Sequence, residues 1–341
     1  MDHSIEDLNS AGIRQWKDIK ADYPEIDLLS GNGFSISFSN KFFYKSIYEN
    51  FKPNCDAQLI NLFEKYETTN FEYILEILRH TATVNREYGL DNSLIKAAAD
   101  SLKNGLITSI NQVHPRKDEM DWGKIVNASH ELVDNFNDIY TTNYDLLLYH
   151  IIMASCDAYR DDDDVKERLQ DYFWGSGSVD YKQFMDYQSY PDYKHVYYLH
   201  GSLCLFQIGL STYKLIKGGR GAELIELISD QIGKYKFPVF VSEGTSYDKE
   251  RSVARNPYLR FCFDKLQASK RPLFIYGLSL ASNDNHIIKR IATNPRKLVI
   301  SIYSEGKTIA EITAEKMNHI VKFGARYKPS IEFVDSRSVF S

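Results

Sequence analysis

The sequence has few cysteines, and no two of them lie close together. The four, Cys55, Cys156, Cys204 and Cys262, form no CxxC pair. Zinc ribbons are built on such pairs, so this spacing argues against a structural zinc site. Isolated thiols are ordinary in a reducing compartment, and we expect them to be buried free cysteines in the cytoplasm.

The sequence also lacks long apolar runs and an excess of basic residues. The longest apolar run, LLLYHIIMA, is too short to cross a bilayer, and residues 1–18 do not have the basic and then apolar pattern of a secretory signal. The formal net charge is -5, so no global basic field attracts nucleic acid. We therefore predict a soluble, cytoplasmic protein with no membrane contact and no tight nucleic-acid binding of its own, although a local basic patch is compatible with this composition.

What the sequence does contain is the composition of a folded protein. Hydrophobic residues make up 43% and charged residues 26% of the chain, and 24 Tyr with 19 Phe argue against disorder. The length of 341 residues fits one large α/β domain with insertions, so we expect a single domain over residues 1–341.

Short apolar segments alternate with amphipathic ones along the chain. Residues 26–39 are predicted to be a buried strand and a glycine turn, with a helix opening at Phe42. A hairpin is expected at 203–217 and a helix at 222–235. This alternation predicts a Rossmann-like, mostly parallel sheet with helices on both faces. Its other strands are expected near 139–141, 195–202, 237–244, 272–279, 298–306 and 331–336, with helices at 256–270 and 282–294.

Two segments are longer than is needed to join neighbouring strands. Residues 58–138 have helical periodicity almost throughout, which predicts an inserted helical layer. Residues 157–194 are acidic and aromatic. The four aspartates at 161–164 are most simply the solvated start of a helix, because carboxylates suit the positive end of a helix dipole.

Small and polar residues follow four of the predicted strands, at 31–35, 141–145, 200–202 and 277–279. The carboxyl ends of parallel strands fall on one edge of a sheet, where open α/β sheets bind their ligands. One ligand can therefore touch all four segments.

Each of these strand ends has a structural explanation beside the chemical one. Asn143 and Asp145 are common at helix N-termini, and Gly31 with Gly33 forms a tight turn whether or not a phosphate approaches it. The third glycine of the dinucleotide fingerprint is missing. His200 is better placed for chemistry, because the glycine after it leaves space beside a side chain that exchanges protons near neutral pH.

The order of these motifs resembles that of the sirtuin superfamily. GNGFS, TTNYD, LHGS, FVSEG, GLSL and ISIYSEG stand where sirtuins have GAGxS, TQNxD, HG, FGE, GTSL and an asparagine-containing last turn, over residues 28 to about 306. The resemblance implies NAD+ as the bound substrate and a reaction that needs no metal.

The resemblance also implies roles for individual residues. Asn143 would hold the ribose and a water molecule, and His200 would act as a base or orient a hydroxyl group. The glycine turn would contact the pyrophosphate, and Gly277 with Ser279 would lie near the adenosine half. The residues implied in binding the cofactor are Gly31, Asn32, Gly33, Ser35, Thr142, Asp145, Gly201, Gly277, Ser279, Asp284 and His286.

Asp284 and His286, which follow the GLSL match, have two explanations. Ser282 or Asp284 can serve as a helix N-cap, with His286 solvated in the first turn. Sirtuin-like proteins of bacterial defence carry a similar GxSxxxxDxH ending, so the resemblance keeps a ligand contact open for both residues.

The sequence departs from the sirtuin pattern in three places. The zinc-binding cysteine pairs are absent, and residues 157–194 take the place of the zinc module. The arginine-bearing cofactor loop, GIPxFR in sirtuins, has no counterpart in residues 36–46, and Ser304 replaces the asparagine of the last turn. These departures argue against a protein deacetylase, whose peptide cleft lies between the zinc module and the sheet.

The function implied by the resemblance is hydrolysis of NAD+ to nicotinamide and ADP-ribose. By analogy with the family, such an enzyme would be a toxic effector of anti-phage defence. Two other functions stay open. One is a module that senses NAD or ADP-ribose without turnover, and the other is a protein-modifying enzyme, either a zinc-free deacylase or an ADP-ribosyltransferase.

A free NAD+ hydrolase in the cytoplasm would poison its own cell, so some restraint is expected. The insertions at 58–138 and 157–194 have apolar faces and aromatic residues that are favoured at interfaces. They would bind a second copy of the chain or, by family analogy, a HerA-type ATPase or a short Argonaute. Alternatively, the aromatic residues only cover the cofactor cleft and form no interface.

Overall fold

A seven-stranded sheet forms the centre of the protein, in the order β10-β9-β8-β1-β2-β4-β3, and every ladder in it is parallel. The computed structural model describes residues 3–42, 47–158, 168–173, 193–216, 223–241, 245–324 and 331–340. The strands of this sheet are β1 (Asp27–Ser30), β2 (Ile139–Thr141), β3 (Arg168–Gln170), β4 (Tyr193–Tyr198), β8 (Leu273–Tyr276), β9 (Leu298–Ile302) and β10 (Ile331–Asp335).

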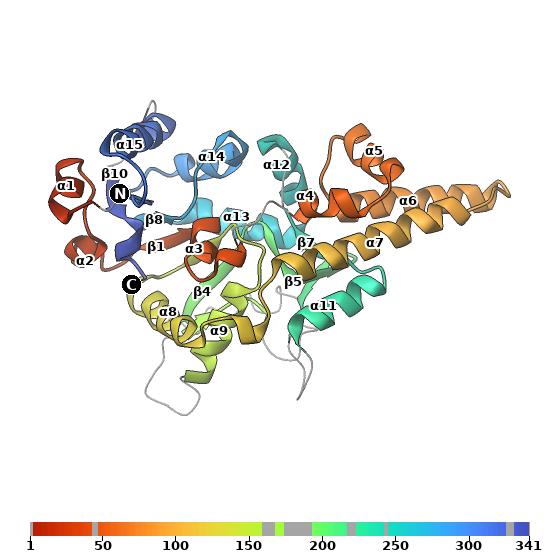
Figure 1. The fold of residues 1–341 in the computed structure, drawn as a ribbon, viewed down its shortest axis with the longest axis horizontal. Helices are drawn as coiled ribbons and strands as arrows, with labels where there is room; N and C mark the ends of the chain where they lie inside the picture. The colour runs from red at the N-terminus through yellow and green to blue at the C-terminus, as the bar shows by residue number, and fades with distance from the viewer. Residues whose placement is uncertain are drawn as a thin grey trace.

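Helices cover both faces of this sheet. From β1 the chain moves outward through β2 and β4, and from β8 it moves the other way through β9 and β10. Right-handed crossovers in opposite directions place their helices on opposite faces. Accordingly α8 (Trp122–Asn135) and α9 (Leu147–Ala158) lie across the sheet from α13 (Pro257–Ala268), α14 (Asn285–Thr293) and α15 (Ile309–Gly324) (Figure 1). The predicted Rossmann-like fold is confirmed.

A second, three-stranded antiparallel sheet consists of β5 (Gly201–Ile208), β6 (Ser211–Lys214) and β7 (Pro238–Phe240), in the order β6-β5-β7. The hairpin predicted at 203–217 corresponds to β5 and β6, and α11 (Leu224–Gly233) follows it. The prediction was wrong for 237–244, because its described part, β7, pairs antiparallel with β5 and not with the main sheet. A short apolar run does not reveal which sheet it joins.

Four helices between β1 and α8 build an arm that projects from the main sheet (Figure 1). They are α4 (Ile47–Phe51), α5 (Ala57–Lys65), α6 (Phe71–Glu87) and α7 (Ser93–Val113). Phe51, Phe63 and Phe71 pack edge to face at the base of the arm. Gly105 of α7 makes room for them, since a Cβ there would lie 2.5 Å from the Phe51 ring. The helical periodicity of 58–138 therefore corresponds to α5, α6, α7 and α8.

Several short elements differ from the sequence-based expectation. The helix predicted to open at Phe42 corresponds in its described part to α4, which begins at Ile47, and a further helix that was not expected, α3 (Asn32–Ile36), begins directly after Gly31. Its five residues are too few to show a helical period. The helices α1 (Ile5–Ser10), α2 (Trp16–Ile19), α12 (Ser246–Arg255) and α15 were not expected. Short 3-10 segments are η1 (Lys20–Asp22), η2 (Asn40–Phe42), η3 (Lys52–Asn54), η4 (Lys117–Glu119), η5 (Ser282–Asp284) and η6 (Ser336–Ser338).

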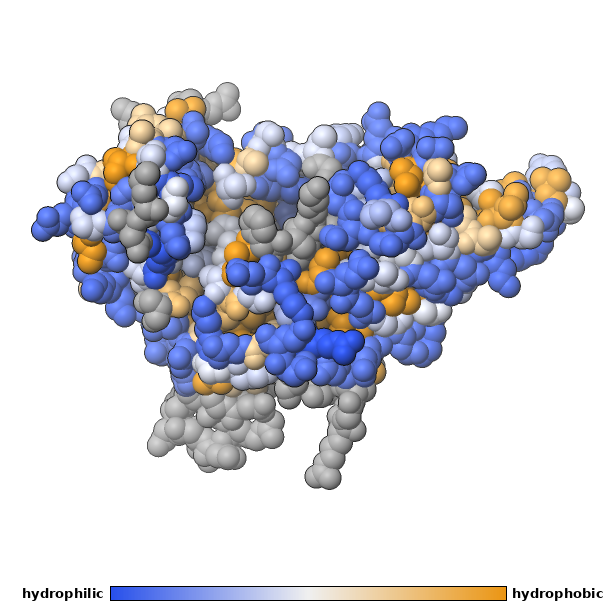
Figure 2. Space-filling model, in the orientation of Figure 1, coloured by the Kyte–Doolittle hydropathy of each residue, from blue (hydrophilic) through white to orange (hydrophobic). Residues whose placement is uncertain are grey.

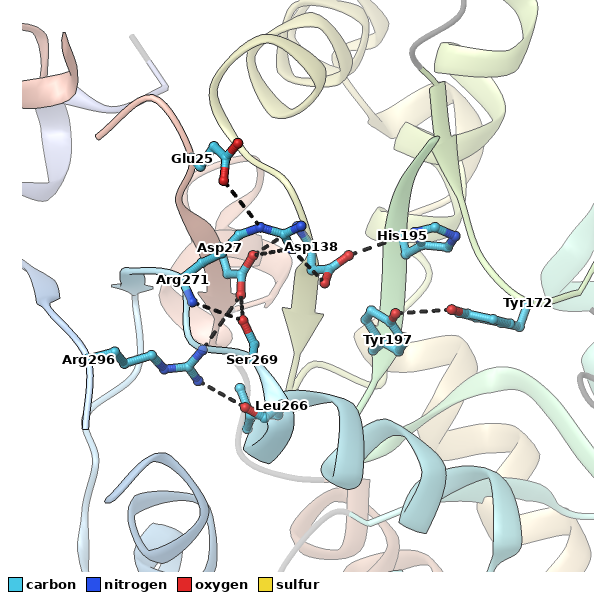
Figure 3. A network of polar contacts seen from close by, with 10 residues as sticks. All are labelled: Glu25, Asp27, Asp138, Tyr172, His195, Tyr197, Leu266, Ser269, Arg271 and Arg296. Carbon is cyan, nitrogen blue, oxygen red and sulfur yellow. Dashed lines mark hydrogen bonds and ion pairs between the residues drawn. The ribbon is translucent and has the colours of Figure 1, made fainter. Parts of the chain in front are cut away.

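An ionic network connects the amino ends of the central strands (Figure 3). Asp27 is fully buried and accepts a hydrogen bond from the Ser269 hydroxyl at 2.5 Å. Arg271 bridges Asp27 and Asp138, and Arg296 Nη1 lies 3.6 Å from Asp27 Oδ2. Burial, with the neighbouring charge of Asp27, raises the pKa of Asp138 to about 6. Because the charges at this end pair with one another inside the protein, ligand chemistry is expected at the opposite, carboxyl end of the strands.

The described part of the acidic and aromatic insertion is a short segment. Residues 168–173 contain β3, which adds to the main sheet beside β4, and Asp171, whose carboxylate accepts a 2.6 Å hydrogen bond from buried Lys214 of β6. The aspartates at 161–164 and most of 157–194 lie outside the described residues.

The cysteines, the helices and the clustering of metal-binding side chains each bear on a prediction from the sequence. All four cysteines are free thiols, and Cys204 and Cys262 are buried while Cys55 and Cys156 are partly exposed. Within the described ranges, no helix is both long and apolar enough to cross a membrane. Among those same residues, no three His, Cys, Asp or Glu side chains gather as metal ligands would.

Candidate functional site

A cavity of about 380 Å³ opens at the carboxyl ends of β8, β1, β2 and β4. The chain reverses its direction of travel across the sheet between β1 and β8, and such switch points are where open α/β sheets bind ligands. The volume lies at the lower end of the range of about 300 to 1,000 Å³ for small-molecule sites. The lining residues are Asn32, Thr142, Asn143, Tyr144, Asp145, His200, Val241, Lys249, Gly277, Leu278, Ser279, Ala281, Asn283 and Asp284.

The structure brings most of the predicted site residues to this cavity. Gly31, Gly33, Ser35, Gly201 and His286 are not on the lining, but each adjoins a residue that is. The predicted residues that line the cavity are Asn32, Thr142, Asn143, Asp145, His200, Gly277, Ser279 and Asp284.

Three polar side chains form a buried chain beneath the cavity. Asn143 Nδ2 donates to Ser35 Oγ at 2.8 Å, and Ser35 Oγ donates to Asp145 Oδ2 at 2.5 Å. Asp145 Oδ1 accepts from the backbone N–H of Leu147 at 2.9 Å, at the start of α9. The aspartate therefore has the helix-capping role open to it from the sequence, and it also orients Ser35.

Burial raises the pKa of the Asp145 carboxyl to about 6, and the hydrogen bonds from Ser35 and Leu147 limit the rise. Asp145 is 4% exposed, and burial is the main cause of the raised pKa. Its ionisation is therefore sensitive to anything that changes the water content of the cavity.

The hydrogen bonds of Asn143 define which of its atoms can meet a ligand. Its Nδ2 also donates to the carbonyl oxygen of Gly31 at 3.0 Å. A carbonyl oxygen only accepts, so the atom that faces it must be the amide nitrogen. Both amide hydrogens are thereby used inside the protein. The side chain therefore offers a ligand its Oδ1, a hydrogen-bond acceptor.

Gly31, Gly33 and Gly277 pack backbone against backbone. A Cβ on Gly31 would lie 2.7 Å from the Gly277 oxygen, and one on Gly33 would lie 2.7 Å from Gly277 Cα. The amides of Gly31 and Gly33 donate to the carbonyls of Tyr276 and Gly277 at 2.8 and 2.9 Å. The N–H groups of Gly31 and Gly33 therefore serve the contact with the end of β8, whereas Asn32 of the same turn lines the cavity, and the contact of this turn with a phosphate stays a prediction.

A stacked pair of histidines lies beside the cavity. His200 in the turn between β4 and β5 and His286 in the first turn of α14 have ring centroids 5.2 Å apart. Their Nε2 atoms are 2.9 Å apart, and both residues are 3% exposed. Burial and then the adjacent imidazole and Lys249 lower the pKa of His200 far below its usual value. Burial and then Lys249 lower the pKa of His286 to about 3.

Asp284 occupies the predicted N-cap position of α14, but the expectation that His286 is solvated was wrong. His286 is buried and not solvated, because its backbone N–H donates to Ser246 Oγ at 2.7 Å and its ring stacks on His200. Asp284 occupies the N-cap position without a capping hydrogen bond from its side chain. Its carboxylate instead accepts from Lys249 Nζ at 3.1 Å.

Lys249 is the site residue that the sequence reasoning missed. It lies on α12, is 5% exposed, and lines the cavity with its partner Asp284. A signal for the helix was present, since Thr245-Ser-Tyr-Asp248 matches a capping box and forms one in the structure. The pairing with Asp284 itself joins residues 35 positions apart, which no local pattern reveals.

The remaining predicted residues have structural reasons for their types. Gly201 has φ +73° in the ladder with β7, and a Cβ there would lie 2.0 Å from the Val239 oxygen. Ser279 is exposed at the rim, and its backbone oxygen accepts from Lys322. Ser304, at the position where sirtuins have asparagine, is buried away from the cavity and donates to Asp335 Oδ1 at 3.1 Å.

The comparison with protein families covers almost all of this structure. The family model described as "Domain of unknown function (DUF4917)" matches residues 28–339. The chain belongs to the DUF4917 family. The match begins in β1 and ends after η6, so both sheets, the helical arm and the cavity lie inside the region that defines a DUF4917 protein.

Other comparisons add little to the DUF4917 assignment. No curated protein matches the chain. A solved structure described as "Structural Basis for the Mechanism and Regulation of Sir2 Enzymes" is 11% identical, with 94% of the DUF4917 chain and 98% of that chain covered. Its TM-score of 0.36 is too low to support an argument about fold or activity.

Proposed function

We propose that this DUF4917 protein binds NAD+ in the cavity at the strand ends and hydrolyses its nicotinamide–ribose bond. The observation that carries the proposal is the convergence of Asn143, Asp145 and His200, from the ends of two strands, on one cavity at the switch point of the sheet. The order of the sirtuin-like motifs suggests the same substrate.

Breaking this bond leaves the electron pair on the nicotinamide nitrogen and an electron-poor ribose carbon. The oxygen of a water molecule then bonds to that carbon and loses a proton, so the products are nicotinamide, ADP-ribose and H+. A hydrogen-bond acceptor fixed in the cavity orients the attacking water or a ribose hydroxyl. Asn143 Oδ1 is suited to this task, because Gly31 and Ser35 hold its amide group in one orientation.

His200 fits the role of hydroxyl orienter better than that of a strong base. Its pKa is lowered far below neutrality by burial, so the imidazole is uncharged but binds a proton weakly. A neutral ring still accepts or donates a hydrogen bond. The ring is already bonded to His286 through Nε2 and to the backbone of Thr142, so we propose that the ligand hydroxyl takes the place of His286 at Nε2.

Lys249 is placed for the role that was expected of the glycine turn, which is contact with the pyrophosphate. Among the lining residues it is the one lysine or arginine, and it faces the cavity from α12. A phosphate oxygen next to Nζ would share this cation with Asp284. We propose that Lys249 contacts the pyrophosphate, since the N–H groups of Gly31 and Gly33 are already bonded.

The test is chromatography of NAD+ incubated with the purified protein. Free nicotinamide and ADP-ribose in equal amounts would support hydrolysis. Unchanged NAD+ together with measurable binding of ADP-ribose would support the sensing module instead. Product that forms only with an acylated peptide, or ADP-ribose found on a protein, would support a protein-modifying enzyme.

The biological role is also a proposal and rests on family analogy. NAD+ depletion would serve anti-phage defence, with turnover controlled by self-association, a HerA-type ATPase or a short Argonaute. Exposed apolar side chains at the tip of the α6–α7 hairpin, where Figure 2 shows hydrophobic residues at the far end of the arm, favour such an assembly. They are Val84, Tyr88, Leu90 and Leu94. NAD+ turnover and light scattering across protein concentration test this, and a fully active monomer would contradict it.

A further inference from the structure

A second, larger cavity lies between the helical arm and the three-stranded sheet. Its volume is about 810 Å³, and its walls come from α6, β5, β7, α12 and the start of α13. The lining residues are Asn70, Tyr73, Glu76, Ile77, Arg79, His80, Gln207, Gly209, Tyr235, Lys236, Phe237, Pro238, Val239, Phe240, Val241, Ser252, Arg255, Asn256 and Leu259. Of the residues in the sirtuin-like motifs, Phe240 and Val241 line this cavity.

The charge of this cavity is opposite to that of the whole chain. Arg79, Lys236 and Arg255 line it against a single carboxylate, that of Glu76, whereas the chain carries a net charge of -5. All four of these side chains belong to exposed residues and stand at the rim. A local positive potential in an acidic protein favours a small anion here.

Aromatic surface accompanies the positive charge. The Arg255 guanidinium lies over the Tyr73 ring, with its central carbon 4.7 Å from the ring centroid. Phe237 and Phe240 supply apolar surface, and Arg79 Nη2 donates to the Tyr235 carbonyl at 2.5 Å. A planar base stacks on such surfaces, and guanidinium groups bind phosphate oxygens in pairs.

We propose that the second cavity binds a small phosphorylated ligand with an aromatic base, of the nucleotide class, independently of the first cavity. The volume falls within the range for small-molecule sites, about 300 to 1,000 Å³. In this proposal the cations at the rim bind the phosphates, and the base stacks on the aromatic surface. This site does not depend on NAD+ hydrolysis in the first cavity.

The two cavities share a wall. Val241 lines both, and its backbone N–H donates to the His200 carbonyl at 2.8 Å. Helix α12 borders the first cavity with Lys249 and the second with Ser252 and Arg255. A nucleotide in the second cavity is therefore in position to alter the first.

Isothermal titration calorimetry with ATP tests the site, with adenosine and tripolyphosphate as partial probes. We expect ATP to bind and each partial probe to bind more weakly, since each lacks one set of contacts. The variant Arg255→Gln should weaken ATP binding about tenfold, the usual effect of losing one charge-assisted contact. Absence of ATP binding by the wild-type protein would overturn the proposal.

Arg251→Gln is the matched control. Arg251 is an exposed arginine of the same helix, lies over Tyr247, and does not line the cavity. It should bind ATP as the wild type does. Equal losses in both variants would overturn the proposal, because they would indicate only a general effect of charge.

A third variant tests in which of the two cavities ATP binds. Ser279 is exposed and lines only the first cavity, so Ser279→Trp should fill that cavity and leave ATP binding intact. ATP binding that is lost in Ser279→Trp and kept in Arg255→Gln would place the nucleotide in the first cavity and overturn the proposal. None of these measurements uses NAD+ turnover, so failure of the proposed hydrolase would leave their outcome unchanged.

Discussion

The Nε2 atoms of His200 and His286 lie 2.9 Å apart in a stacked, buried pair of imidazole rings. Two neutral imidazoles can form this hydrogen bond only if one donates its Nε2–H and the other accepts. Burial and the neighbouring Lys249 keep both rings neutral, so the pair is a fixed polar contact rather than a charged one.

Protonation of His286 should destabilise the fold as the pH falls. Its pKa is about 3 in the folded protein and about 6.5 when unfolded, so between these values the unfolded chain binds more protons. Stability should therefore fall from about pH 6.5 downward, by about 1.4 kcal/mol per pH unit for a single proton. Urea unfolding at several pH values measures this slope.

Asp138 and Asp145 act in the opposite direction between about pH 4 and 6, because burial raises their folded pKa values to about 6. Both carboxyl groups are present in wild type and in His286→Gln, so their contribution to the pH dependence of stability cancels when the two proteins are compared. The variant should show the shallower acid dependence, and exposed His80→Gln should not. Identical slopes for His286→Gln and wild type would contradict the prediction.

Replacing Asn143 by Asp should harm both stability and activity. The change puts a carboxylate where the amide nitrogen now donates to Gly31 and Ser35, so two buried hydrogen bonds are lost. We expect a loss of about 1 to 3 kcal/mol in the free energy of unfolding, and abolished nicotinamide release. Urea midpoints and chromatography measure these effects. Asn9→Asp, at an exposed position, is the control, and equal stability of the two variants would refute the described geometry.

Gly277→Ala should be more damaging than Gly306→Ala. Both glycines have positive φ, at +65° and +75°, but a Cβ on Gly277 would lie 2.6 Å from the Phe34 nitrogen whereas nothing lies within 4 Å at Gly306. Gly306→Ala should cost about 1 kcal/mol for backbone strain alone, and Gly277→Ala clearly more. Denaturant midpoints measure the loss of stability in each variant. Equal losses would show that the close packing of these loops is unimportant.

Lys249→Gln should weaken the binding of ADP-ribose about tenfold if this side chain meets the pyrophosphate. The single change leaves Asp284 buried without its cation, so Lys249→Gln combined with Asp284→Asn should also be measured. Exposed Lys289→Gln serves as the control. Undiminished affinity in both the single and the double variant would remove Lys249 from the site.

His200→Ala should abolish nicotinamide release. The histidine is buried and bonded to His286, so its removal also disturbs packing, and His200→Gln keeps a polar atom with less loss of volume. Circular dichroism establishes that each variant is folded before turnover is compared. Near wild-type turnover in folded His200→Ala would show that this residue is not catalytic.

The main sheet and the place of the cavity could be predicted because they depend on local patterns and on a general rule of topology. Apolar strands alternate with amphipathic helices, and the carboxyl ends of parallel strands meet at one edge. Asn143 and His200 were found in this way. The type of residue and its position at a strand end were sufficient.

What the sequence did not reveal depends on contacts between distant residues. The motif Gly31-Asn-Gly33 is the same whether a phosphate or the Gly277 loop fills the space beside it. The burial of His286 requires Ser246 and His200, from other elements. Similarly, β7 is a three-residue strand whose choice of sheet depends on the bulge and hairpin of β5.

The contact between the turn after β1 and the end of β8 allows separation of these two loops to be measured by hydrogen exchange. The amides of Gly31 and Gly33 are bonded to successive carbonyls, those of Tyr276 and Gly277, so neither can exchange its hydrogen for deuterium until the two loops separate. Their exchange should therefore be slow and should occur together. A ligand that holds these loops in place would slow both amides by the same factor, which gives a readout of occupancy that needs no knowledge of the reaction.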